Sequence, residues 1–345
     1  MSEKKHIFND IVFVRLGLIV LLVFFHAFAI FGGAWHRKFT PPNVEFYYWL
    51  DWLSYSFMLE SFVFISGFLF GNQEKRNGGM LLGKLILKKA KRLLLPSLIF
   101  SVLYFFCFQY AGDLGWKHIY DWMIGTAHMW FLPMLFLCFV VVGILREQIV
   151  EYFRLVVVIS IVLSLFSFIS LPFRIDKTLD YFTFFVIGYS VGLKNNNVFD
   201  YSHKRVKSIG AFFIASFVGF TLLNRHLMEI KGAYPAMTRC FFYVIMNTGK
   251  LIYSSLGVML VYMLMNRIKQ QGNFVIHGYW MEISECCFGV YLIQQFVLVF
   301  LYDYTSLPTI INYVWLPWLC FLITLIASVI LSWLFRQTKL GRVLI

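Results

Sequence analysis

The chain has 345 residues, of which 60% are hydrophobic and 20% aromatic, and its mean hydropathy is +0.74. This excludes an ordinary soluble globular protein, because charged residues make up 14% here against about 25% in such proteins. The net charge of +13 would suit a nucleic-acid partner, but most of the excess Lys and Arg lies in connections on one side of the predicted helices. We therefore expect no nucleic-acid partner.

Apolar stretches recur along the whole chain and predict an all-α fold, a polytopic membrane helical bundle of about ten transmembrane helices. We expect a single transmembrane domain over residues 1–345, with no fused soluble domain, because no connection exceeds about 20 residues. The predicted spans are 11–31, 50–70, 93–111, 129–145, 154–172, 179–193, 208–224, 240–266, 284–302 and 315–335.

The first span carries two ionisable side chains on one helix face. Arg15 and His26 are eleven positions apart, close to three helical turns, so both project to the same side about 16 Å apart along the axis. Intramembrane charges are costly and usually mark a function. We expect His26 to act as a base that activates an alcohol; the alternative is a buried histidine bonded to a neighbouring helix.

The second span contains a carboxylate and a small-residue pair among bulky aromatic residues. Glu60 lies in the middle of this span and either pairs with Arg15, His26 or Lys250, or lines a cavity. Ser66 and Gly67 permit the close approach of another helix or of a ligand.

A basic amphipathic run, residues 84–96, precedes the third span and contains Lys88, Lys91 and Arg92. This run is either a topology anchor on anionic lipid headgroups or a phosphate site for a polyanionic substrate. At the mouth of the fourth span, His128 is placed to bind a substrate, and Trp130 is partly an interfacial aromatic residue.

Two later spans have unusual features. The predicted span 179–193 is short, which indicates tilt or local thinning of the bilayer. Span 240–266 contains Asn247-Thr248-Gly249-Lys250 and is either a broken helix or a long tilted one.

The distribution of Lys and Arg predicts the orientation in the membrane. With the N-terminus cytoplasmic, 20 of the 30 Lys and Arg residues fall on the cytoplasmic side and 8 on the other. This excess predicts that both termini are cytoplasmic.

The ordered set of motifs resembles the acyltransferase 3 family, bacterial integral-membrane enzymes that acylate cell-surface glycans. The motifs are Arg15-x10-His26, the Phe-rich helix with Ser66-Gly67, the basic run ending at Pro96, His128-x-Trp130-Phe131, Gly188-Tyr189 in a Phe-rich helix, and Tyr291-Leu292-Ile293-Gln294. Gln294 departs from the family pattern, which often has His at this position, and Glu60 stands where an apolar residue or Pro is expected.

The resemblance implies an O-acyltransferase in the bacterial inner membrane. Its donor would be acyl-CoA, most simply acetyl-CoA, used as a co-substrate with no bound cofactor and no metal. The partners would be acyl-CoA, a carbohydrate acceptor and membrane lipid. The resemblance implies catalytic roles for His26 and Arg15 and donor binding by Lys91 and Arg92. We further expect Lys88, Ser66 and Gly67 to take part in donor binding, and His128, Trp130, Glu60 and Gln294 in substrate binding.

Two other classes of function remain open at this point. A transporter or flippase would also use intramembrane charges such as Glu60 and Lys250, although no repeated half is visible in the sequence. A sensor or scaffold without chemistry is disfavoured, since no soluble input or output domain is predicted. Within the enzyme class, direct transfer and an acyl-histidine relay are not distinguished by the residues.

Overall fold

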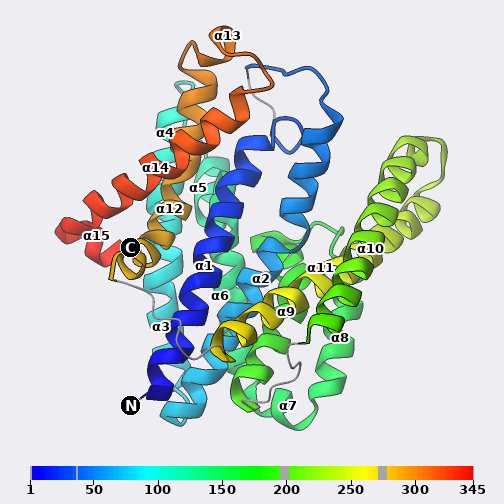
Figure 1. The fold of residues 1–345 in the computed structure, drawn as a ribbon, viewed down its shortest axis with the longest axis vertical. Helices are drawn as coiled ribbons and strands as arrows, with labels where there is room; N and C mark the ends of the chain where they lie inside the picture. The colour runs from blue at the N-terminus through cyan, green and yellow to red at the C-terminus, as the bar shows by residue number, and fades with distance from the viewer. Residues whose placement is uncertain (1, 36–37, 195–201, 271–277, 345) are drawn as a thin grey trace. The chain divides into compact units, whose positions relative to one another are not determined.

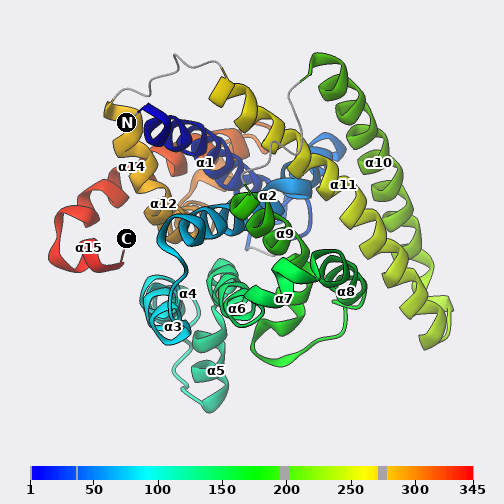
Figure 2. The same ribbon diagram turned by 90° about the horizontal axis from the view of Figure 1, so that it is seen from below.

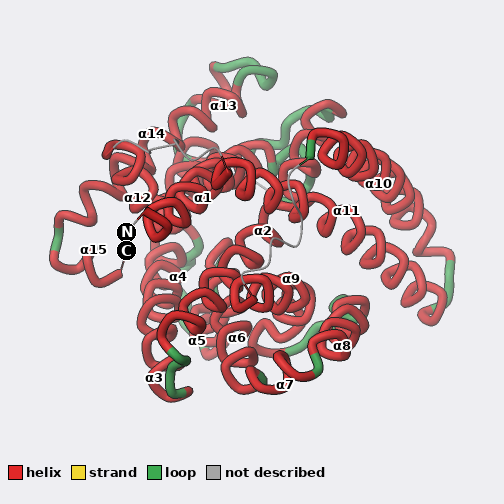
Figure 3. Tube along the Cα trace, turned by 60° about the horizontal axis from the view of Figure 1, so that its bottom comes forward, coloured by secondary structure: helices red, strands yellow, loops and turns green. Residues whose placement is uncertain are grey.

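The computed structural model describes residues 2–35, 38–194, 202–270 and 278–344, and within them every regular element is helical (Figures 1 and 3). The predicted all-α class is therefore confirmed. Helices satisfy their own backbone hydrogen bonds, which a bilayer requires of any segment that crosses it. The long helices are α1 (Ser2–Phe28), α2 (Glu45–Asn77), α4 (Leu95–Phe108), α6 (Phe131–Ile144), α8 (Phe153–Leu165), α9 (Ile175–Lys194), α10 (His203–Ile230), α11 (Ala236–Gln270), α12 (Gly278–Asp303) and α14 (Leu316–Gln337).

Shorter helices connect the long ones. They are α3 (Leu82–Lys89), α5 (Trp116–Ile124), α7 (Arg146–Glu151), α13 (Leu307–Ile310) and α15 (Lys339–Leu344). A π-helical turn, Ala90–Leu94, joins α3 to α4 and contains the end of the basic run. Single π-turns of this kind occur frequently at functional sites.

Eight segments in the described part of the chain are long and apolar enough to cross a membrane. They coincide with eight of the ten predicted spans, so the protein is a membrane-spanning helical bundle. The segments are Asp10–Phe28, Glu45–Asn77, Leu82–Phe108, Ala127–Ile144, His203–Ala233, Ala236–Gln270, Gly278–Asp303 and Leu316–Gln337.

The two other predicted spans, 154–172 and 179–193, are also helical, but one helix is shorter than predicted and the other carries charges near its start. The predicted range 154–172 is too long, because α8 ends at Leu165 and has only 13 residues. The Asn247 side-chain amide donates to the carbonyls of Ser164 (3.4 Å) and Leu165 (3.0 Å) and so caps this end. The predicted range 179–193 lies within α9, which has 20 residues and carries several charges near its first turns, including Asp180.

Helix α11 is continuous over 35 residues and is not broken at Asn247–Lys250. Asn247 and Lys250 contact other helices, and Thr248 donates to the Val244 carbonyl of its own helix, so the long-helix alternative is the correct one. At 1.5 Å per residue such a helix is about 50 Å long, which exceeds the bilayer core and requires tilt or extension beyond it.

The chain forms two compact units, which we call the terminal unit (residues 1–58 and 264–345) and the central unit (59–263). In the terminal unit, α1 packs against α12 and α14, and α12 packs against α14 (Figure 1). The Tyr302 hydroxyl donates to the Ala27 carbonyl at 2.7 Å. The Tyr47 hydroxyl donates to the Val314 carbonyl at 2.5 Å. These bonds fix the ends of three helices around a buried aromatic cluster.

In the central unit, α2 and α9 cross through two reciprocal glycine pairs. On α2, a Cβ added at Gly67 would lie 2.2 Å from a backbone oxygen of α9, and one at Gly71 would lie 2.1 Å from another. On α9, a Cβ added at Gly188 would lie 2.1 Å from a backbone oxygen of α2, and one at Gly192 would lie 2.2 Å from another. Both helices thus use the small-xxx-small pattern that lets membrane helices approach closely. This crossing positions the charged residues described below.

The other central helices pack around this crossing. Helix α9 contacts α8 and α6, and α6 also contacts α3. Helices α10 and α11 lie side by side (Figures 1 and 2), with the rings of Phe217 and Tyr253 5.8 Å apart.

Candidate functional site

His26 lies near the C-terminal end of α1 in the terminal unit and is 7% exposed. Its Nδ1 lies 3.0 Å from the Leu22 carbonyl, and a carbonyl can only accept, so Nδ1 carries the proton and donates. In the neutral ring Nε2 is then unprotonated, which is the form that serves as a general base. The Trp35 ring lies 5.6 Å from the imidazole and helps to enclose it.

Arg15 is half-buried on the same helix, three turns before His26. It lies near enough to Cys287 of α12 to interact with it electrostatically. Because Tyr302 of α12 bonds to Ala27 at the other end, α12 runs parallel to α1 along the length that separates Arg15 from His26.

Gln294 of α12 lies between these two contacts. It is fully buried, and neither its amide nitrogen nor its amide oxygen has a hydrogen-bond partner among the described residues. A buried amide without partners is rare in proteins and usually has a water, ion or ligand to explain it. Gln294 therefore stays a substrate-binding candidate of the terminal unit.

The other eight candidate residues belong to the central unit, where Glu60 forms part of a buried ionic network. Its side chain is 1% exposed and Oε1 lies 3.7 Å from the Lys250 ammonium. Lys250 also forms a 2.6 Å ion pair with Asp180. Of the alternatives left open for Glu60, the structure shows Lys250 as its ion-pair partner. The three charges come from α2, α9 and α11, so the network joins three helices.

Aromatic rings extend this network. The Lys250 ammonium lies 4.6 Å from the centre of the Tyr181 ring, a cation–π distance. The Trp130 ring lies 6.0 Å from Tyr181. Trp130 and Glu60 thus belong to one cluster of charges and rings. His128 is buried on the same short 3-10 turn as Trp130, with its ring 6.5 Å from that of Tyr104 in α4.

Ser66 and Gly67 have local roles in the helix crossing. The Ser66 hydroxyl donates to the Phe62 carbonyl of its own helix at 2.8 Å. Gly67 faces the backbone of α9 near Phe185. Of the two alternatives for this pair, the close approach of a helix accounts for Gly67 without a ligand.

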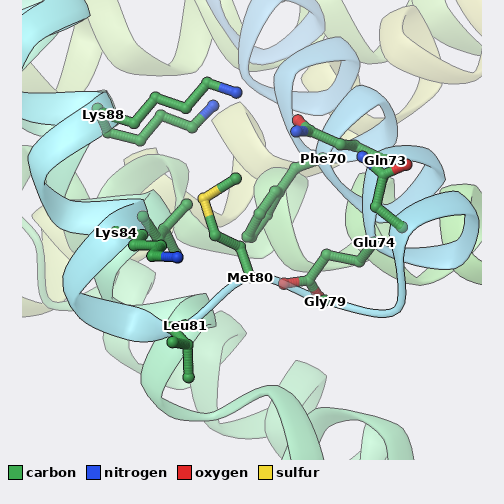
Figure 4. Close-up of a pocket in the computed structure, with 11 residues that line it drawn as sticks. Phe70, Gln73, Glu74, Gly79, Met80, Leu81, Lys84 and Lys88 are labelled. Carbon is green, nitrogen blue, oxygen red and sulfur yellow. The ribbon is translucent and has the colours of Figure 1, made fainter.

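The basic run lines a cavity of about 260 Å³ in the central unit. Figure 4 shows Lys88 reaching from α3 toward Gln73 of α2, and Lys84 and Lys89 also line the cavity. Lys84 and Lys88 are four positions apart, so they share one helix face. Lys91 and Arg92 are exposed and do not line it.

Glu74 also lines this cavity, but its charge is compensated. The Tyr189 hydroxyl donates to one carboxylate oxygen at 2.5 Å, and Arg146 lies 3.6 Å from the other. Arg146 further donates to the carbonyls of Met80 (2.9 Å) and Gly143 (3.1 Å). It thereby holds the loop that forms one wall. The cavity keeps a surplus of positive charge from Lys84 and Lys88, which suits a phosphorylated ligand.

A family model described as an acyltransferase domain matches residues 8–337, nearly the whole chain. The chain belongs to the acyltransferase 3 family. Comparisons with curated proteins and with solved structures gave no match. The protein is thus a membrane acyltransferase, and the resemblance drawn from the ordered motifs is confirmed.

Several residues of the site are not evident from the sequence. Asp180 and Tyr181 belong to the ionic network, and Lys84 and Lys89 line the basic cavity. The four-residue spacing of Lys84 and Lys88 predicts that both side chains lie on one face of a helix, which is the face that lines the cavity. Asp180 had no such signal, because its partner Lys250 lies 70 positions away. Within the described residues, no group of three His, Cys, Asp or Glu side chains could hold a metal ion.

Proposed function

We propose that this acyltransferase moves an acyl group, most simply acetyl, from acyl-CoA to a hydroxyl of a cell-surface polysaccharide or glycolipid sugar. The observation that carries the proposal is His26, a buried imidazole whose Nδ1–H is held by a carbonyl, in a chain of an acyltransferase family. That tautomer presents a base at Nε2, as activation of a hydroxyl requires.

The chemistry balances with His26 as a proton carrier. Nε2 takes the proton from the sugar hydroxyl while the hydroxyl oxygen bonds to the thioester carbonyl carbon. The carbon–sulfur bond then breaks, and the CoA thiolate takes the proton from the imidazolium. The products are the O-acyl sugar and CoA, and His26 returns to its neutral form. Arg15 orients the donor by charge.

The basic cavity supports binding of the CoA head, which carries several negative charges. Lys84 and Lys88 provide ammonium groups, and Gln73 also lines the cavity. Lys91 and Arg92 stand on the adjoining π-helical turn and are exposed, where they attract the approaching donor.

In the central unit, Trp130, His128 and Glu60 are the acceptor contacts that we propose, and in the terminal unit it is Gln294. Aromatic faces pack against the apolar faces of sugar rings, and buried carboxylates and amides bond sugar hydroxyls. We place the protein in the bacterial inner membrane with both termini cytoplasmic, as the Lys and Arg count predicts.

The test uses inverted membrane vesicles that contain the wild-type chain or His26→Ala, supplied with acyl-labelled acetyl-CoA. We expect label in the glycan fraction with wild type only, at equal protein amounts. His26→Gln is the matched control for lost packing, since it keeps polarity and volume but not basicity, and it should also be inactive. Full transfer by either variant would refute the role of His26.

Direct transfer is distinguished from a relay by quenching the reaction with labelled donor in the absence of acceptor. A labelled protein band that His26→Ala lacks would establish an acyl-histidine intermediate and would replace direct transfer. Transport of glycan without dependence on acyl-CoA would instead favour the transporter alternative.

A further inference from the structure

A second cavity, of about 510 Å³, lies in the central unit away from the basic run. Helices α2, α8, α9 and α11 form its walls, and eight of its twelve lining residues are Phe, Val, Ile or Met. These helices lie in or beside the predicted membrane-crossing segments. The cavity is within the size range of small-ligand sites, and its lining suits a hydrocarbon chain.

One face of α9 lines the cavity along its length, with apolar residues first and a cation at one end. Phe184, Ile187, Val191 and Lys194 follow each other at spacings of three or four residues, so they share one face of this helix. From Phe184 to Lys194 this face is about 15 Å long. The apolar residues occupy most of this length, and the single cation of the lining stands at the end of the helix.

The ammonium of Lys194 is held at that end by an aromatic contact. It lies 5.3 Å from the centre of the Phe153 ring, at the first residue of α8. Tyr262 also lines the cavity, and its ring packs edge-on against that of Phe64 with the ring centres 5.6 Å apart. The result is an apolar slot with one positive charge at its end.

We infer that this cavity binds one anionic membrane phospholipid, with an acyl chain in the slot and the phosphate beside Lys194. A phospholipid has the matching arrangement of one negatively charged end and a long apolar body. Basic residues that adjoin apolar pockets between membrane helices favour anionic headgroups. The count of Lys and Arg predicts that Lys194 is on the cytoplasmic side, where anionic lipids are enriched.

The charge of the cavity distinguishes this ligand from a donor acyl chain. Acyl-CoA carries several phosphate charges, which match Lys84 and Lys88 of the basic cavity, whereas this slot offers one cation for one phosphate. The inference therefore stands apart from the proposed function and does not depend on it.

Native mass spectrometry of the full-length protein in mild detergent tests the inference, with titrated phosphatidylglycerol and phosphatidylcholine as probes. Wild type should retain one phosphatidylglycerol with about fivefold preference over phosphatidylcholine, the contribution expected of one basic residue. Lys194→Gln should lose the preference. Lys177→Gln, at the other end of the same helix, is the matched control and should keep it.

A second variant tests the apolar slot. Met259→Trp fills the cavity from α11 and should reduce retention of both lipids several-fold, while the elution profile and helix content stay those of wild type. Equal retention of phosphatidylglycerol by wild type and Lys194→Gln would overturn the inference. It would also be overturned if wild type retained neither lipid, or bound long-chain acyl-CoA in the slot instead of phospholipid.

Discussion

Substitution of Lys250 by Met is the sharpest test of the buried ionic network. Lys250 is the only cation that the structure gives to Glu60 and Asp180 among the described residues. Its removal would leave two carboxylates in the interior of a helical bundle, one of them with a 1% exposed side chain. One carboxylate must then take up a proton, or the helices must separate to admit water.

The expected loss follows from the distances. At an effective dielectric constant of about 20, ion pairs of 2.6 Å and 3.7 Å are worth roughly 6 and 4 kcal/mol in Coulomb energy. Desolvation of the charges offsets much of this, and breaking a buried pair by removing one partner costs about 3–5 kcal/mol. Since the Lys250 side chain is 23% exposed, we expect a loss near the lower end, about 3 kcal/mol.

Thermal unfolding of the detergent-purified protein measures this loss. Lys250→Met should unfold well below wild type, and the double variant Lys250→Met/Glu60→Gln should recover part of the difference because it removes one uncompensated charge. Lys204→Met, an exposed cation on α10, is the control and should behave as wild type. An unchanged unfolding temperature of Lys250→Met would refute the assignment of this network.

Three further predictions concern packing, donor and acceptor. Gly188→Ala should destabilise the protein by about 1–3 kcal/mol in thermal unfolding, because the added Cβ would lie 2.1 Å from the Phe64 carbonyl oxygen. The control is Gly219→Ala, which has open space around it and should be neutral or stabilising. Lys88→Gln should raise the KM for acyl-CoA about tenfold, the loss of one charge-assisted hydrogen bond, with kcat nearly unchanged in steady-state kinetics; an unchanged KM would exclude Lys88 from the donor site. Gln294→Leu should preserve stability, since no hydrogen bond is lost among the described residues, and should reduce transfer to the acceptor in the vesicle assay; wild-type transfer would show that this amide contacts no substrate.

Much of the fold was predictable because membrane helices are specified locally. An apolar run of about 20 residues predicts a span wherever it occurs, since a bilayer leaves the backbone no partner except itself. The end of α8 was not predictable in this way. Residues 166–172 are also largely apolar, and the helix ends at Leu165 where the Asn247 side chain binds its last carbonyls from another helix.

The glycine crossing was partly predictable. Gly67 and Gly71, like Gly188 and Gly192, have the four-residue spacing of close-packing membrane helices. The sequence shows that each pair favours a close neighbour, but it does not show that the two pairs face each other. That pairing joins segments about 120 positions apart, and only packing selects it.

The sequence by itself determined the membrane-spanning helical class and the pair Arg15 and His26 on one helix face, because these depend on local hydropathy and helical periodicity. The ordered set of motifs in the sequence indicated the family. The tertiary structure decided that Glu60 pairs with Lys250, that Lys84 and Lys89 join Lys88 at a cavity, and that Gln294 is buried without a protein partner within the described residues. Each of these outcomes depends on which helices become neighbours. Side-chain contacts between residues as distant as 60 and 250 follow from that choice and not from any local pattern.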